Sequence, residues 1–349
     1  MKVHGLLGTL VLACAACSDG MDPIPAEVAS DTIANLPRIP SVSVPLRGQV
    51  VFAAFSGERR DLYMADAAGT TLRPLTADSV VDDCGVVSPD GMRIAFSRNG
   101  VHYTMRADRS DLRLTMEKPA GFRHVTCPAW SNDSRMLVYI SRERQIKGSC
   151  WGSLHIVNAD GTALRTIRDG PYFSSAEWSR DDGRLLLVSH ECAGAPYGFK
   201  VHVTDADGRE IMVLPAGYWG ASWSPTGREF AYACPTQATA ICIASSDGTS
   251  PRALTDPDAR ALEPRWSPDG SRIAYVSAAD FSVYTINPDG TGKRSILTRE
   301  RGGFPYVWSP DGKFLAFFCN GICTSRADGS DITRLTSLTE VGVPSWSPQ

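Results

Sequence analysis

The sequence has little net charge and no apolar run long enough to cross a membrane as a helix. Its 35 Lys and Arg residues nearly balance its 38 Asp and Glu residues, so the formal net charge is −3. Proteins that bind nucleic acids through their phosphates need a basic excess, and we therefore expect no nucleic-acid partner. No stretch reaches the roughly 20 apolar residues of a transmembrane helix. With 43% hydrophobic residues, however, the chain is too apolar to be disordered.

The sequence also lacks the short motifs of common catalytic sites. It contains no Gly-x-Ser-x-Gly nucleophile elbow, no His-Glu-x-x-His zinc motif and no phosphate-binding loop. His155 and His202 fall on expected strands, where a structural role is the simpler interpretation. We therefore assign no catalytic residue, metal or cofactor, and the sequence favours a protein that is not an enzyme.

The N-terminus is typical of an export signal. Residues 1–17 combine a basic start, a short apolar run and small residues, and they end at Cys17. This end resembles the lipobox of bacterial lipoproteins, in which the cysteine carries the lipid. Lipidation at Cys14 and ordinary cleavage without a lipid are the alternatives. Residues 18–46 are rich in proline and predict an extended tether. We expect a monomer that is periplasmic or at the cell surface, held by its lipid at the outer membrane.

The remainder of the chain, residues 47–349, consists of successive copies of one sequence repeat. A Trp-Ser pair recurs at Trp130, Trp178, Trp223, Trp266, Trp308 and Trp346, and Val87-Ser88 fills the same place once. A period in the low forties, with four short strand-like pieces in each period, indicates the blades of a β-propeller. Turn residues follow most of these pairs, as in the Ser-Pro-Asp-Gly sequences after Trp266 and Trp308. Apolar and β-branched runs then predict strands, for example over 93–97, 185–189, 272–277 and 314–318.

The repeat count predicts how the ring closes. Six complete repeats begin at Val87 and at the first five Trp-Ser pairs. The leading segment 49–76 has the last three strands of a blade, and the chain ends with a first strand at Trp346. We expect these parts to combine into a seventh blade. The predicted fold is an all-β, seven-bladed propeller of four-stranded antiparallel blades, closed by the C-terminal strand.

The motif Trp-Ser-Pro-Asp-Gly, followed by Ile-Ala-Phe-like strands and Asp-Gly turns, resembles the WD40-like repeat of the TolB family. Similar repeats occur in prolyl oligopeptidase-type propellers. TolB itself has six blades and an N-terminal α/β domain, for which residues 18–46 are too few. The resemblance therefore implies a propeller fold but gives no support for a role in the Tol–Pal system.

Eight of the ten cysteines lie in the repeats, and an even number in an exported protein favours disulfides. Cys234 and Cys242, like Cys319 and Cys323, flank a hairpin turn and should face each other across two strands. Cys84 and Cys127 hold equivalent positions in neighbouring blades, and Cys150 and Cys192 lie in comparable loops. A metal site is the alternative, but the body has no Cys-x-x-Cys pair to support it.

One set of residues is a candidate binding face. The connections from the last strand of one blade to the first strand of the next carry aromatic and charged residues, which would suit a peptide or sugar surface. They are Phe122, Arg123, His124, Tyr172, Phe173, Tyr218, Trp219, Glu263 and Phe304. The alternative is that the aromatic residues fill gaps between blades.

The sequence thus favours a non-enzymatic extracytoplasmic scaffold that binds a protein, peptide or envelope component through one face. The alternative is a propeller that binds glycans or acts on polysaccharides in the manner of a lyase.

Overall fold

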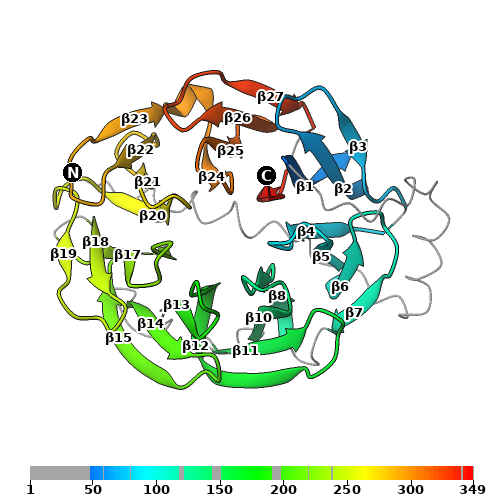
Figure 1. Ribbon diagram of the computed structural model, residues 1–349, viewed down its shortest axis with the longest axis horizontal. Helices are drawn as coiled ribbons and strands as arrows, with labels where there is room; N and C mark the ends of the chain where they lie inside the picture. The colour runs from blue at the N-terminus through cyan, green and yellow to red at the C-terminus, as the bar shows by residue number, and fades with distance from the viewer. Residues whose placement is uncertain are drawn as a thin grey trace, which may run out of the picture.

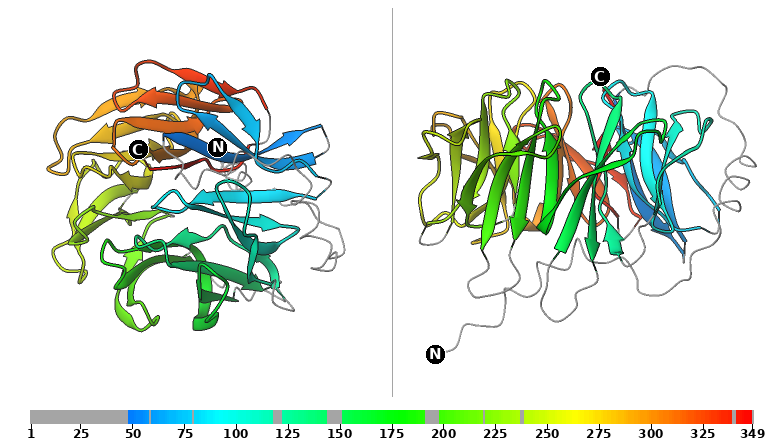
Figure 2. Two further views of the ribbon diagram at one scale, coloured as in Figure 1. Left: turned by 45° about the vertical axis from the view of Figure 1, so that its right-hand side comes forward. Right: turned by 90° about the horizontal axis from the view of Figure 1, so that it is seen from below.

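The computed structural model is a ring of seven four-stranded antiparallel blades (Figure 1). It describes residues 48–57, 59–78, 80–117, 122–143, 151–190, 198–218, 220–236, 239–338 and 341–348. Figure 2 shows the ring from the side, with the strands running between its two faces. Within these residues no helix has the length and apolar character needed to cross a membrane. The fold class predicted from the repeat is confirmed.

The blades are numbered from the one that contains the first strand, and their strands are listed from the axis outward. Blade I contains β28 (Ser345–Trp346), β1 (Gln49–Ser56), β2 (Arg59–Asp66) and β3 (Leu72–Pro74); blade II contains β4 (Asp82–Val87), β5 (Arg93–Arg98), β6 (Val101–Arg106) and β7 (Arg113–Met116). Blade III contains β8 (Phe122–Val125) and β9 (Ala129–Trp130), then β10 (Met136–Glu143), β11 (Trp151–Asn158) and the first part of β12 (Arg165–Trp178).

Blade IV contains the second part of β12, then β13 (Arg184–His190), β14 (Phe199–Asp205) and β15 (Glu210–Ala216). Blade V contains β16 (Ala221–Trp223), β17 (Glu229–Cys234), β18 (Ala240–Ser245) and β19 (Arg252–Ala253), and blade VI contains β20 (Ala261–Trp266), β21 (Ile273–Ser277), β22 (Val283–Ile286) and β23 (Arg294–Leu297). Blade VII follows the short 3-10 helix η2 (Arg299–Arg301) and contains β24 (Gly303–Trp308), β25 (Phe314–Phe318), β26 (Ile322–Arg326) and β27 (Thr333–Thr336).

The C-terminal strand closes the ring as predicted. β28 pairs antiparallel with β1, so that Trp346 faces Val50 and Ser345 faces Val51. Outside the ladder, the Gly48 N–H donates to the Pro348 carbonyl over 2.9 Å. Blade I is therefore assembled from both ends of the folded chain, and no long sheet edge is left open at the junction.

The Ser-Pro-Asp-Gly turn explains the regularity of the inner hairpins. In blade II the Ser88 hydroxyl donates to Asp90 over 2.6 Å and accepts the Arg93 N–H over 2.9 Å. The same pair of contacts recurs at Ser267 and Ser309. These side chains satisfy the polar groups of the turn locally, so the hairpin depends little on the rest of the blade.

The repeated tryptophan joins each blade to the preceding one. Its indole packs in the core between two sheets, and its N–H donates to a carbonyl of the preceding inner strand. The distances are 3.0 Å from Trp130 to Val86, 3.2 Å from Trp178 to Ala129 and 3.1 Å from Trp308 to Arg265. Trp266 is an exception, since it donates within its own turn to Gly270. A residue that is both large and a single donor suits this position, which explains why the sequence repeats it.

Candidate functional site

The inner strands are irregular near one face of the ring. In β4, β12, β20 and β24 the pairing with the next strand shifts register within the five residues before the repeated tryptophan position. Cys84 and Glu263 adopt left-handed φ values of 59° and 52° within two of these bulges, and the Phe304–Pro305 peptide bond in a third is cis. Bulges re-aim side chains and are common beside binding sites. This face is therefore the first place to look for a ligand.

The structure describes the side chains of five of the nine predicted binding-face residues. Phe122, Arg123 and His124 lie in β8, but the description does not extend to their side chains, and Trp219 lies outside the described residues. Phe304 is half-buried against the core between blades VI and VII.

Phe173 corrects the prediction. It is completely buried between blades III and IV, so it fills a gap in the core and cannot touch a ligand. Tyr172 and Phe173 do not lie in a connection, because β12 runs without a break from blade III into blade IV and merges their sheets.

Four aromatic rings instead form a continuous row across one end of blade IV. Tyr172, His190 and Phe199 face one another across β12, β13 and β14, and their ring centroids are 4.3 and 5.7 Å apart. Tyr218 follows, with its ring 5.5 Å from that of Phe199. Phe199 is buried, whereas the other three are half-buried. We call these four residues the aromatic row.

The row leads to charged residues on the inner strands of blades IV and VI. The Glu263 carboxylate lies 3.6 Å from the Arg265 guanidinium. Burial, together with the charge of Glu263, raises the pKa of Tyr218, which places this phenol in the field of the carboxylate. Burial raises the pKa of Glu263 itself, and Arg265 opposes the rise. Glu177, Glu263 and Arg265 form what we call the charged sector.

A glycine makes room for this carboxylate. Gly220 has a φ of 98°, and a Cβ atom there would lie 2.7 Å from the Glu263 Cα and 3.0 Å from its Oε2. Any side chain at this position would displace Glu263. The Tyr306 hydroxyl also fixes Glu263, since it donates to the Glu263 carbonyl over 2.7 Å. The position of Glu263 is therefore held by blades V and VII as well as by its own.

Glu177 occupies a position that most blades fill differently. In three blades the side chain just before the tryptophan position accepts the N–H of the corresponding residue in the next blade: Ser345 from Val87 over 3.0 Å, Ser222 from Trp266 over 3.2 Å, and Glu177 from Trp223 over 3.0 Å. Burial raises the pKa of Glu177 to about 7, with Arg265 and the Trp223 N–H opposing the rise.

Glu177 and Arg265 were missed in the sequence. The available signal was a departure from the repeat, because this position holds only Val86, Ala129, Ser222, Val307 and Ser345 in the other blades.

Two buried histidines make contacts that resemble a catalytic relay. His202 Nε2 lies 2.7 Å from the Ser189 hydroxyl, and its Nδ1 lies 2.9 Å from the Glu210 carboxylate. Burial lowers the pKa of His202, although Glu210 opposes this. Ser189 is completely buried, however, so no substrate can reach its hydroxyl. His155 makes a similar contact with Ser141 over 2.7 Å. Both histidines fasten neighbouring strands, in agreement with the structural interpretation.

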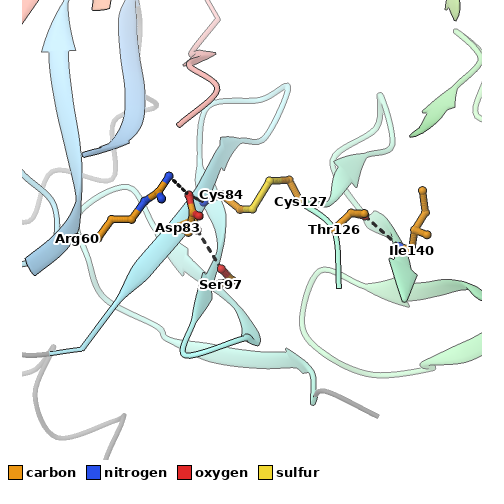
Figure 3. Close-up of a disulfide and its surroundings, with 7 residues drawn as sticks. All are labelled: Arg60, Asp83, Cys84, Ser97, Thr126, Cys127 and Ile140. Carbon is orange, nitrogen blue, oxygen red and sulfur yellow. Dashed lines mark hydrogen bonds and ion pairs between the residues drawn. A yellow bond between two sulfur atoms is a disulfide. The ribbon is translucent and has the colours of Figure 1, made fainter. Parts of the chain in front are cut away.

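Disulfides join Cys84 to Cys127, Cys234 to Cys242 and Cys319 to Cys323. These are three of the four pairs expected from the repeat. The fourth pair, Cys150 and Cys192, lies outside the described residues. Figure 3 shows the Cys84–Cys127 bond crossing from blade II to blade III, while Asp83 pairs with Arg60 of blade I over 3.1 Å. Consecutive residues of β4 thus attach blade II to both of its neighbours.

Potential metal ligands gather at one place in the part of the ring that the structure describes. Oxygens of Asp61, Asp78 and Asp82 all lie within 4.8 Å of one another between blades I and II. Arg98 donates to Asp82 through Nε and Nη2 over 2.8 and 2.7 Å and pairs with Asp78 over 2.8 Å. The cluster therefore has three carboxylates around one guanidinium.

Comparison with known proteins supports the propeller fold but does not identify an activity. No known family model matches the chain. It is 26% identical over 212 residues to the uncharacterized peptidase YuxL of Bacillus subtilis. The matched region covers 58% of this chain but only 31% of that relative. The chain thus spans less than a third of the length of that curated protein.

Two solved structures share most of the architecture. The structure of an oligogalacturonate lyase in complex with manganese has a TM-score of 0.63 at 16% identity and covers 77% of this chain and 82% of its own. TolB from Acinetobacter baumannii has a TM-score of 0.56 at 14% identity, and the match covers 86% of this chain and 67% of TolB. At these identities the likeness establishes a propeller similar to both proteins, and nothing about chemistry.

Proposed function

We propose that this protein is a non-enzymatic binding scaffold, which holds a protein, peptide or envelope component through the face that carries the aromatic row and the charged sector. The observation that carries the proposal is that Tyr218, the last ring of the row, lies two residues before Gly220, which packs directly against Glu263. Half-buried aromatic rings supply contact area at low entropic cost, and a fixed carboxylate beside them gives orientation.

Specific binding rather than reaction is favoured by what surrounds these residues. The side chains of the charged sector are carboxylates and a guanidinium, and within the described residues the serines bonded to His155 and His202 are buried in strands. A surface of this kind can stack on a ligand and donate or accept hydrogen bonds, and its charged sector carries no hydroxyl or thiol nucleophile.

The experiment is a selection of ligands with matched variants. Peptides from a displayed library would be selected on the purified protein and then measured against Tyr218→Ala, Glu263→Gln and a control, Tyr284→Ala. Tyr284 is also a half-buried aromatic residue, but it lies on β22, away from the row. We expect the first two variants to weaken binding at least tenfold, while Tyr284→Ala binds normally. Equal binding by all four proteins would refute the proposed face.

The same protein would be incubated with oligogalacturonate and with its polymer, polygalacturonate, with and without manganese, because an oligogalacturonate lyase solved with manganese shares this fold. New unsaturated ends, detected by their ultraviolet absorbance, would show that the protein is an enzyme and would overturn the scaffold proposal. Binding of the polymer without cleavage would retain a scaffold and change its ligand to a glycan.

We further propose that the scaffold works outside the cytoplasm, anchored through a lipid on Cys17. The three disulfides support an oxidising compartment. The test is fractionation of cells that produce the wild type, Cys17→Ser or Cys14→Ser, with a labelled fatty acid in the medium. We expect only Cys17→Ser to lose both the label and the membrane association. Loss in Cys14→Ser alone would move the anchor, and an unlabelled wild type would refute it.

A further inference from the structure

We propose that Asp61, Asp78 and Asp82 form a binding site for a hard divalent cation, with calcium as the ion that fits best. The three residues come from two blades: Asp61 lies in β2 and Asp78 follows β3 in blade I, whereas Asp82 begins β4 in blade II. Their ligand oxygens lie within 4.8 Å of one another. Calcium binds oxygens at about 2.3–2.6 Å, so that oxygens on opposite sides of the ion are about 5 Å apart. The spacing therefore allows all three carboxylates to reach one ion.

The charges within the cluster are unbalanced. Asp61, Asp78 and Asp82 are 2%, 7% and 0% exposed, and Arg98, which is 1% exposed, is the guanidinium paired with Asp78 and Asp82. When all three carboxylates are ionised, they and the guanidinium carry two net negative charges away from water, which is costly unless a proton or a cation neutralises them. A divalent ion would bring the total to zero.

Asp61 gives an independent indication of a ligand. Its Oδ1 atom is buried and accepts no hydrogen bond. Arg98 bonds to the other two carboxylates, so among the described residues the Asp61 Oδ1 atom has no hydrogen-bond donor. Buried polar atoms in folded proteins nearly always have a partner, and a bound cation would supply one for a carboxylate oxygen in a group of three carboxylates.

The repeat shows that the fold does not require these charges. The equivalent junction between blades V and VI is aligned by the Thr255 hydroxyl, which accepts the Ile241 N–H as Thr76 accepts the Leu62 N–H. There, Ala240, Pro257, Ala261 and Ser277 stand in place of Asp61, Asp78, Asp82 and Arg98. A junction without charged residues at these positions thus also forms between two blades. The acidic residues between blades I and II are therefore not needed for the blades to pack.

The location gives the site a structural consequence. Blade I is the blade completed by the C-terminal strand, and Arg60 already pairs with Asp83 across the same junction. A cation held by both blades would fasten the closing blade to its neighbour. Removal of the ion would loosen the ring at this place while the disulfide from Cys84 still held blade II to blade III.

The test uses the intact protein stripped with a chelator and then titrated with calcium, with magnesium and manganese measured in parallel. Isothermal titration should show one site in the wild type, and saturating calcium should raise the melting temperature by about 5 °C. Asp61→Ala copies the residue of the equivalent junction and should fold normally, but it should bind calcium at least tenfold more weakly and lose the thermal response. Asp289→Asn, which removes an exposed hairpin carboxylate, is the control and should retain both.

Three results would overturn the proposal. They are the absence of heat and of a thermal shift at millimolar concentrations of all three ions, equal calcium binding by Asp61→Ala and the wild type, and loss of binding in the hairpin control. Asp61→Asn gives a second measurement that keeps the shape of the side chain. It should be at least as stable as the wild type without calcium and less stable with it, because it removes buried charge but also a ligand.

Discussion

Because the C-terminal strand closes the ring, we expect Trp346 to contribute strongly to the stability of the fold, although it lies almost at the end of the chain. Only two residue pairs join β28 to β1, and the indole is 7% exposed between blades I and VII. Its N–H donates to the Val307 carbonyl over 3.3 Å. Removal of a buried tryptophan side chain costs about 3–5 kcal/mol, and the short ladder cannot compensate for that loss. We expect Trp346→Ala to lose this amount of stability in equilibrium denaturation with urea.

Trp308→Ala is the matched control, because Trp308 makes the same contacts inside a blade whose four strands are consecutive in sequence. Its loss of stability should be similar. Hydrogen exchange should separate the two variants: the amides of β1 should exchange faster in Trp346→Ala, which frees one side of that strand, but not in Trp308→Ala. If Trp346→Ala stays within about 1 kcal/mol of the wild type, or if β1 remains equally protected, the closure does not hold the ring in the way described.

Three further predictions concern the cysteines, Glu177 and Phe173. Replacement of Cys84 and Cys127 by serine should cost about 4 kcal/mol in denaturation experiments, against about 2 kcal/mol for Cys319 and Cys323, because 43 rather than 4 residues separate the paired cysteines; equal losses would contradict this dependence. Since the pKa of Glu177 is raised to about 7, its contribution to stability should fall by at most about 3 kcal/mol between pH 4.5 and 7, and Glu177→Gln should make the pH slope of the wild type shallower by that amount in urea titrations at several pH values. Phe173→Ala should cost about 3–5 kcal/mol but leave the affinity of a selected ligand unchanged in the folded fraction, and a specific binding defect would restore Phe173 to the binding face.

The fold could be predicted because the residues of each repeat determine its turns and strands locally. The side chains of the turn serine and aspartate bond to each other and accept backbone N–H groups of the same turn, and the tryptophan supplies both core packing and the contact to the preceding blade. These interactions need no knowledge of distant residues, so their recurrence in the sequence was enough to count the blades. Pairs of cysteines followed from the same register, since equivalent positions in neighbouring blades lie side by side.

The continuity of β12 could not be predicted in this way. Gly170 and Pro171 are residues that usually end strands, and the sequence therefore indicated a connection between blades III and IV. In the structure both residues still pair with β11, as Gly170 faces Gly152 and Pro171 faces Trp151. The strand continues because its two halves are paired on different sides, first with β11 and then with β13. Pairing partners thus outweighed the local preference of the two residues.

The candidate site was predicted only in part, because it consists of departures from the repeat that are brought together by neighbouring blades. Tyr172, Tyr218 and Glu263 were recognised as aromatic or charged residues, but Phe173 has the same character and is core. At the position before the tryptophan, Ser222 and Ser345 already make the contact between blades that Glu177 makes. A serine is therefore sufficient for closure, and the carboxylate in blade IV provides a charge beyond what the fold requires. The same reasoning applies to Asp61, Asp78 and Asp82, whose counterparts between blades V and VI are apolar. In a ring of similar blades, such charges are the residues whose presence folding alone does not explain.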